Sequence, residues 1–372
     1  MSLARPHASR LLTALAVSWI GFALAGCQSD NGTAPAPAPA TASFRALGDL
    51  PGGDVHSEAL AVSDDGRVVV GRSSSARFTE EGFLWAGADT LTPLLGAGGV
   101  PVASEPRAIT ATGDAVAGKI GIAGGFVAAQ WTAATGWVSV GDIVGGTLIS
   151  QVLGMSANGT VLVGWGSSDA GFESVRWTAG TPVAMGDLPG GVFNSAAAQV
   201  SADGQTIAGT GSSTSGPEAY VWTQSGGMVG LGDLEFGAFE SEAFGMNGNG
   251  SVIVGEATSA AGVEAFRWIA AGGMQGLGDL AGGDFHSTAF DVSDDGAVVV
   301  GFATTGAGSE AFIWDAALGM RNLKDVLVAA GVTALSGWTL TEATGISADG
   351  HTVIGNGTNP NGQAEGWVAR LP

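Results

Sequence analysis

A short sequence phrase recurs seven times between residues 44 and 371, and this repetition limits the fold more than any other feature of the chain. Each copy closes an apolar run with a glycine, and most copies end a later segment with a tryptophan. The glycines are Gly71, Gly118, Gly164, Gly209, Gly255, Gly301 and Gly355, and the tryptophans are Trp85, Trp131, Trp177, Trp222, Trp268 and Trp314. The glycine intervals are 47, 46, 45, 46, 46 and 54 residues. A period in the forties with four short strand signals per unit predicts the blades of a β-propeller.

The local chemistry of each repeat agrees with that prediction. Asp-Gly or Asn-Gly stands between the first two strand signals in most repeats, for example at Asp203-Gly204 and Asn249-Gly250. These pairs supply the positive φ that a tight hairpin needs. The second repeat differs, because it has Gly113 before an aspartate. The apolar run that follows the turn, such as residues 298–300, predicts a strand that is buried on both faces. The third strand ends in the repeated aromatic residue, which most simply packs one blade against the next; the last repeat has Ala369 at the tryptophan position. The fourth strand of the sixth repeat is expected at residues 320–326.

The two ends of the repeat region complement each other. Residues 44–50 match the fourth strand of a repeat with no first three strands before them, and residues 366–371 match a third strand with no fourth after it. Pairing the two pieces completes one blade and hides the edges that an open array would expose. We therefore predict an all-β fold over residues 44–372, a seven-bladed β-propeller of four-stranded blades. The N-terminal strand is expected to close it by pairing into the last blade.

The N-terminus predicts export. Arg5 and Arg10 precede an apolar stretch, residues 11–25, that is short for a transmembrane helix. Residues 24–27 read Leu-Ala-Gly-Cys and resemble a bacterial lipoprotein cleavage box. That resemblance implies a signal peptide over residues 1–26 and lipidation of Cys27, the only cysteine of the chain. The alternative is an ordinary signal peptide with an incidental cysteine.

The segment after the cleavage box predicts a tether. Residues 27–43 hold Cys27 and an Ala/Pro-rich run that favours an extended spacer without a packing face. Gln28 follows the cysteine, which in the lipoprotein sorting rule favours the outer membrane. We therefore expect a cell-envelope protein, anchored to the outer membrane on its periplasmic side or at the cell surface.

The charge of the chain limits its partners. Lys and Arg number 13 against 34 Asp and Glu, a formal net charge of −21. Such a surface repels nucleic acid and anionic membranes, so contact with the membrane is expected through the lipid anchor only. It favours cations, basic partners or plain solubility, and we expect a monomer.

Several phrases together resemble the HAF-type extracellular repeat family of bacteria. These are GDLPGG at residues 48–53, SADG at residues 201–204 and 347–350, and EAFRW at residues 264–268. The resemblance covers residues 44–371. The His-Ala-Phe that names the family is mostly Glu-Ala-Phe here. Membership implies a location outside the cytoplasm, and the family has no established activity.

An aspartate recurs within the fourth strand signal of six repeats, after a glycine in five of them and after a lysine in the sixth. The six are Asp49, Asp142, Asp187, Asp233, Asp279 and Asp325. One interpretation is a ring of calcium ligands, although neither the calcium nonapeptide nor the EF-hand signature is present. The other is that each carboxylate accepts backbone N–H bonds in the glycine-rich turn that follows. We favour the second and expect no cofactor, with calcium as the alternative.

The turns after the fourth strands and the polar gaps after the second strands are expected to share one face, which we call the loop face. Its candidate binding residues are Asp54, His56, Glu58, Glu218, Glu240, Glu242, Glu264, Asp284, His286 and Glu310. The two histidines occupy equivalent places in different repeats, which favours a repeat position over a metal site. Loops that converge on a rigid scaffold are where partners bind.

Catalytic motifs give little support for an enzyme. The chain has no His-Glu-x-x-His zinc motif, and we find no nucleophile elbow with catalytic partners. We therefore predict a non-catalytic module that binds an envelope or extracellular protein or glycan on the loop face. The alternatives are a polysaccharide-processing enzyme that uses paired carboxylates from different blades, and a structural surface repeat protein without a specific ligand.

Overall fold

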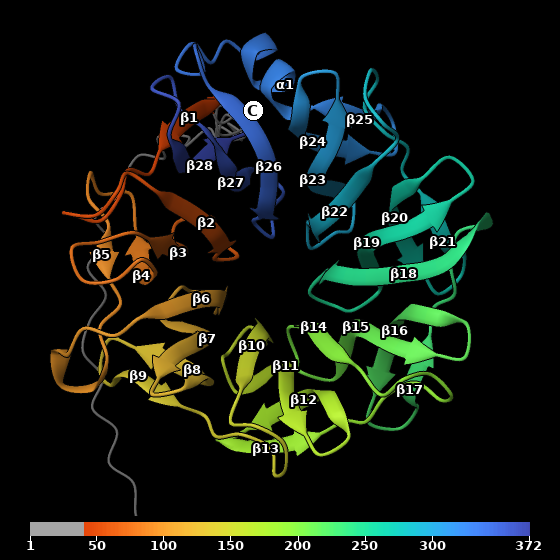
Figure 1. The fold of residues 1–372 in the computed structure, drawn as a ribbon. Helices are drawn as coiled ribbons and strands as arrows, with labels where there is room; N and C mark the ends of the chain where they lie inside the picture. The colour runs from red at the N-terminus through yellow and green to blue at the C-terminus, as the bar shows by residue number, and fades with distance from the viewer. Residues whose placement is uncertain (1–40) are drawn as a thin grey trace, which may run out of the picture. The chain divides into compact units, whose positions relative to one another are not determined.

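The computed structural model describes residues 41–372, which form seven four-stranded antiparallel sheets arranged around a central axis (Figure 1). The predicted seven-bladed β-propeller is thereby confirmed. Cys27, the signal peptide and most of the tether lie outside the described residues. Within residues 41–372, no helix has the length and apolar character needed to span a bilayer.

The first six blades follow the sequence, and each runs from an inner strand to an outer strand. Blade 1 contains β2 (Ser57–Val62), β3 (Val69–Ser73), β4 (Glu81–Trp85) and β5 (Thr92–Pro93), followed by the 3-10 turn Ala97–Gly99. Blade 2 contains β6 (Ser104–Ile109), β7 (Ala115–Ile122), β8 (Gly125–Thr132) and β9 (Gly136–Ser139). Blade 3 contains β10 (Ser150–Met155), β11 (Val161–Ser168), β12 (Gly171–Thr178) and β13 (Thr181–Ala184).

Blade 4 contains β14 (Ala196–Val200), β15 (Thr206–Ser213), β16 (Gly216–Thr223) and β17 (Gly227–Gly230). Blade 5 contains β18 (Phe236–Met246), β19 (Val252–Ser259), β20 (Val263–Ile269) and β21 (Gly273–Gly276). Blade 6 contains β22 (Ser287–Val292), β23 (Val298–Thr305), β24 (Gly308–Asp315) and β25 (Gly319–Asn322). The helix α1 (Leu323–Ala329) follows β25 directly.

Blade 7 combines the two ends of the described chain. It contains β26 (Thr339–Ile346), β27 (Thr352–Thr358) and β28 (Ala364–Arg370), and its outer strand is β1 (Ser43–Ala46). β1 lies antiparallel to β28, with Phe44 opposite Ala369. Beyond the strand, the N–H of Leu47 donates to the carbonyl of Gly366 at 2.9 Å. The chain therefore meets itself where the first and last repeats adjoin.

Hairpin turns between the first and second strands join the blades at one face. In blade 1, Ser63 Oγ donates to Asp65 Oδ1 at 2.7 Å, and Gly66 takes the left-handed φ of 68° that the turn requires. Neighbouring turns are then linked by hydrogen bonds. The backbone N–H of each residue donates to the next residue in the series Ala111, Ala157, Ala202, Gly248, Asp294, Ala348 and Asp64. The acceptor is the backbone carbonyl, except at Asp294, whose side-chain Oδ1 accepts. We call this chain of bonds the hub.

Apolar side chains fill the spaces between blades. Trp177 is 1% exposed and packs in a cluster that joins Ala108 and Ala117 of blade 2 to Val152 and Leu162 of blade 3. This confirms the prediction that the repeated aromatic residues pack one blade against the next. In blade 7 the tryptophan position holds Ala369, and the buried Trp367 stands at the position that Phe312 has in blade 6.

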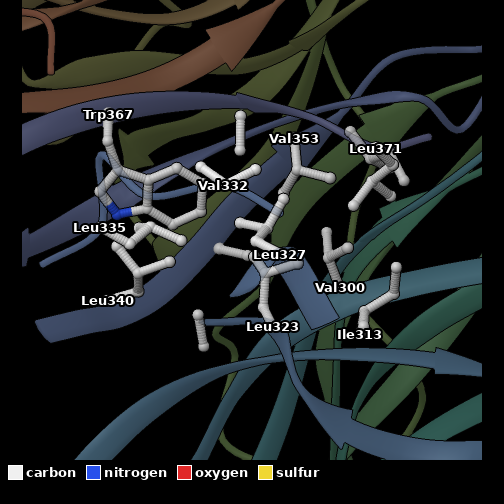
Figure 2. Packing of buried hydrophobic residues seen from close by; sticks show 14 of the residues in the cluster. Val300, Ile313, Leu323, Leu327, Val332, Leu335, Leu340, Val353, Trp367 and Leu371 are labelled. Atoms are coloured by element: carbon white, nitrogen blue, oxygen red, sulfur yellow. The ribbon is translucent and has the colours of Figure 1, made fainter. Parts of the chain in front are cut away.

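The long interval between Gly301 and Gly355 contains a helix. The sequence pattern predicted that the fourth strand of blade 6 would extend over residues 320–326. This is wrong, because β25 ends at Asn322, whose side chain caps α1 by accepting from the N–H of Asp325. Figure 2 shows Leu323 and Leu327 among Val300, Ile313 and Val353, between blades 6 and 7. Burial of this apolar helix face outweighs the strand pattern.

A buried serine at the start of most inner strands joins neighbouring blades. Ser287 Oγ accepts from the N–H of Ala265 at 2.9 Å and donates to the carbonyl of Gly278 at 2.7 Å, and the residue is 0% exposed. We expect Ser287→Ala to lower the free energy of unfolding by about 1–3 kcal/mol, because two buried backbone groups lose their partner. Denaturant titration measures this. Ser309→Ala, on the exposed side of β24, is the control, and equal losses in both variants would contradict the prediction.

Candidate functional site

The loop face is assembled by contacts between two kinds of connection. The N–H of Ala76, after β3, donates to the carbonyl of Pro51, which lies before β2. The N–H of Ser195, before β14, donates to the carbonyl of Phe172 in the hairpin of β11 and β12. The turns after the outer strands therefore lie beside the turns after the second strands, at the face opposite the hub.

Several of the predicted binding residues are accessible on this face. Asp54, Glu240 and Asp284 are exposed. His56 and Glu58 meet at 3.1 Å, between Nε2 and Oε1, and Glu58 also binds Arg72 at 2.8 Å. His286 lies away from them, on blade 6, with its ring 5.4 Å from that of Phe302. His56 and His286 are therefore not in contact with each other.

The glutamates of the third strands are occupied by local bonds. Glu218 Oε1 accepts from the N–H of Gly232 at 3.1 Å, and Glu264 Oε1 accepts from the N–H of Gly278 at 2.9 Å. Glu310 accepts instead from Thr305 Oγ1 at 2.7 Å. Glu218 and Glu264 hold the backbone of their blades and Glu310 holds a threonine side chain. Asp54, Glu240 and Asp284 are the exposed members of the predicted set.

The recurring aspartates are mostly backbone acceptors. In Asp187, Asp233 and Asp279, Oδ1 accepts from the following residue and Oδ2 from the residue seven positions on, at 2.7–3.2 Å. The structural interpretation is confirmed for these three. Asp325 differs, because it lies in the first turn of α1. Among residues 41–372, no three His, Cys, Asp or Glu side chains are placed to hold a metal ion.

A buried ionic cluster lies between blades 1 and 2, and the sequence analysis missed it. Glu105 is 1% exposed and is bound by Arg72 at 3.1 Å, Lys119 at 3.0 Å and Arg107. Burial alone raises the pKa of Glu105, but the charges of Arg107, Lys119 and Arg72 outweigh it and lower the pKa overall. The cluster places three cations on one wall of the propeller.

Across the ring, two carboxylates face each other without that compensation. Glu242 of β18 lies directly opposite Glu256 of β19. Burial, followed by the negative charges of Glu256 and Glu240, raises the pKa of Glu242. Glu256 accepts a hydrogen bond from Thr288 of blade 6. A carboxyl group with a raised pKa beside a second carboxylate is the arrangement that a general acid uses.

Exposed apolar side chains are a second feature that the sequence analysis missed. Within residues 41–372, 12 large hydrophobic side chains are exposed, and seven of them lie in loop-face connections or at the strand ends beside them. The seven are Val55, Val100, Val144, Leu148, Phe172, Val192 and Phe236. The most exposed follow blades 2, 3 and 4: Val144 at 94%, Val192 at 84% and Phe236 at 86%. The face therefore has an apolar side, and Asp54 and Asp284 mark an acidic side.

Each inner strand carries a β-bulge that turns one side chain into the central channel. The bulged residues are Leu60, Arg107, Leu153, Ala198, Phe244, Phe290 and Thr344. Together with the hub they line a cavity of about 270 Å³. Arg107 stands at a position that other blades fill with apolar or small residues, and this was the only sequence signal for the cavity.

No protein-family model matches the chain, and no curated protein matches it in sequence. Among solved structures it is similar to TolB from Acinetobacter baumannii, with 13% identity and a TM-score of 0.47; the match covers 69% of this chain and 64% of that one. It is also similar to an oligogalacturonate lyase in complex with manganese, with 12% identity, a TM-score of 0.55 and coverage of 84% and 88%. A third is the oligogalacturonate lyase of Vibrio parahaemolyticus, with 10% identity, a TM-score of 0.55 and coverage of 90% and 98%. At these identities the likeness shows the fold alone.

Proposed function

We propose that the propeller is a non-catalytic binding module, tethered to the outer membrane through lipidated Cys27, which captures an envelope protein on its loop face. The observation that supports this most is the gathering of exposed apolar side chains in adjoining loops of that face. Exposed apolar patches with a polar border mark protein interaction sites, since exposure of such surface to water is unfavourable.

The backbone at Phe236 adds to this support. Phe236 has φ 73°, a left-handed conformation that a non-glycine residue adopts at a cost of about 1–3 kcal/mol. The same residue exposes 86% of its side chain. A strained residue that presents an aromatic ring to solvent contributes nothing to the core, so its geometry is better explained by contact with a partner.

The chemistry of the face favours a protein over a glycan. Aliphatic side chains such as Val144, Leu148 and Val192 offer neither the ring faces nor the hydrogen bonds that sugars need, whereas they match the core of a protein interface. Asp54 and Asp284, on the acidic side, would meet basic residues of the partner. With a net charge of −21 the whole chain would steer a basic partner toward itself.

The capture of envelope proteins by three matched forms tests this function. The loop-face variant carries Phe172→Ser, Val192→Ser and Phe236→Ser. The control variant carries Val138→Ser, Val183→Ser and Val229→Ser, whose side chains are exposed to 48%, 56% and 52% on the outer strands. We expect one partner to be retained by the unchanged protein and the control, and binding to fall at least about tenfold in the loop-face variant, or about 1.4 kcal/mol. Equal retention by all three forms would rule out the apolar side as the interface.

A carboxylate pair supports the enzyme as the second candidate. Polysaccharide-processing enzymes use a pair of carboxyl groups, which Glu242 and Glu256 would provide. The raised pKa of Glu242 suits a general acid. Neither residue lines the 270 Å³ cavity, however. The binding module therefore remains the better-supported function.

A further inference from the structure

The channel cavity has one aromatic wall. Phe244 of β18 and Phe290 of β22 both line it, with ring centroids 5.9 Å apart in an edge-on arrangement. Phe302 extends the same stack, 5.7 Å from Phe290. Edge-on aromatic pairs are favourable sites for a further ring or a flat apolar group. This wall therefore provides an aromatic surface in a cavity whose other lining residues are aliphatic, small or polar.

The opposite wall provides a cation. β6 lies across the ring from β18 and β22 in Figure 1. Arg107 of β6 lines the same cavity as Phe244 and Phe290. Arg107 binds Glu105 through Nε, and its two terminal nitrogens have no acceptor among residues 41–372. Its side chain remains 39% exposed. A guanidinium with two free N–H edges is suited to bind a carboxylate in a bidentate manner.

The hub end of the cavity provides anions. Asp64 and Asp294 line it, and both flank the same residue, since Ala348 donates to the carbonyl of Asp64 and accepts from the N–H of Asp294. Burial, then the charges of Asp294 and Asp65, raises the pKa of Asp64. Two carboxylates that repel each other are stabilised by a cation placed between them.

We propose that the channel cavity binds a free α-amino acid with an aromatic or large apolar side chain. The ligand carboxylate would pair with Arg107, its ammonium with Asp64 and Asp294, and its side chain would lie against Phe244 and Phe290. The cavity of about 270 Å³ is slightly smaller than the pockets of about 300–1,000 Å³ that hold drug-sized ligands. Its size therefore suits one molecule as small as an amino acid. This site shares no residue with the apolar side of the loop face, so it is independent of the proposed function.

Binding of L-phenylalanine to the full chain, measured by calorimetry, tests the proposal. Two probes lack one charge each: 3-phenylpropionate has no ammonium, and phenethylamine has no carboxylate. We expect saturable binding of L-phenylalanine with a dissociation constant below about 1 mM, and at least about tenfold weaker binding of either probe. Failure of L-phenylalanine to bind, or binding of either single-charge probe as tight as that of L-phenylalanine, overturns the proposal.

Variants assign each charge to its residue. Arg107→Gln should weaken the binding of L-phenylalanine and 3-phenylpropionate but leave phenethylamine unchanged, and Asp64→Asn should show the converse pattern. Arg67→Gln is the matched control, because Arg67 is 81% exposed and pairs only with Asp65 within residues 41–372. Melting temperatures of all three variants establish that they fold. Equal losses for every ligand in Arg107→Gln and Asp64→Asn would exclude the assigned orientation.

Discussion

A variant that lacks residues 44–50 is expected to melt far below the full protein and to associate into oligomers. The deletion removes most of β1 and leaves β28 with an open edge. It also removes Leu47 and Leu50, which are 3% and 2% exposed in the core between blades 7 and 1. Loss of each buried leucine costs about 2–5 kcal/mol, which together approach the total stability of a domain.

The same segment makes contacts beyond the strand. Phe44 packs on Trp338 at 5.1 Å and on Trp367 at 6.1 Å between ring centroids, and Trp367 belongs to the core shown in Figure 2. The N–H of Gly48 donates to Glu365 Oε1 and that of Leu50 to Ser73 Oγ, both at 2.9 Å. Deletion would remove the partner of Glu365 Oε1 and one of the partners of Ser73 Oγ, which keeps its bond to the carbonyl of His56.

Size-exclusion chromatography with thermal unfolding checks the result, and a rescue variant provides the control. In the other blades the third and fourth strands are joined by a short turn, as between β16 and β17. Residues 42–50 attached after Pro372 through a short glycine linker should therefore re-form the outer strand and restore a monomer. A truncated protein that remains monomeric and melts at the original temperature would show that ring closure by this strand is wrong.

The second large effect is a loss of stability as the pH rises from about 4 to about 7. Asp291 lies in the channel wall, where its Oδ1 accepts from Val292 N–H at 2.8 Å and its Oδ2 from Ile346 N–H at 2.9 Å. Burial raises the pKa of Asp291 to about 7, against the opposing effect of these two bonds. The charge of Asp64 raises it further.

The direction of the effect follows from the protons bound. Below pH 3.8, both folded and unfolded chains hold a proton on Asp291, so its stabilising contribution is fully present. Between pH 3.8 and about 7, only the folded chain holds it, and stability falls by roughly 1.4 kcal/mol per pH unit. The total is at most roughly 4 kcal/mol, reduced by water that reaches the channel.

Urea unfolding of the protein and of Asp291→Asn at several pH values measures this contribution. The difference between the two curves isolates residue 291, because carboxyl groups such as Asp65 and Asp203, whose pKa values are lowered by hydrogen bonds to serines, affect both proteins equally. We expect the stability of the unchanged protein to fall relative to the variant as the pH rises. Parallel curves would mean that Asp291 titrates normally in the folded state.

The repeat period was enough to predict the blades, because a glycine, a turn and an aromatic residue in fixed order indicate where each strand begins and ends. The repeat period did not indicate the direction of individual side chains. A bulge at Arg107 or Phe290 shifts the register by one residue, and such a shift moves a side chain to another face. The cavity was therefore not predicted, although the candidate loop face was. Likewise, Glu264 matched an exposed position in the sequence but lies against a backbone N–H.

The helix between β25 and β26 shows a different limit. A strand-like apolar pattern at residues 320–326 ended in a helix because Asn322 caps it and because Leu323 and Leu327 find a buried surface there. The cap is local, since Asn322 and Asp325 are three residues apart, but the buried surface is supplied by residues that are distant in sequence, such as Val353 and Trp367. Local patterns predict the element least well where the repeat is irregular, as it is in this 54-residue interval.

The hub turns keep similar hydrogen bonds from blade to blade, whereas the connections at the opposite face differ in length. Ala348 keeps both of its hub bonds although the preceding repeat interval is longer than the others. The extra residues at the opposite face therefore leave the hydrogen bonds of the hub intact. New binding specificities can therefore arise, or be engineered, by exchanging exposed turns of the loop face, such as residues 189–192 between β13 and β14, whereas α1 has to keep Leu323 and Leu327 in the core.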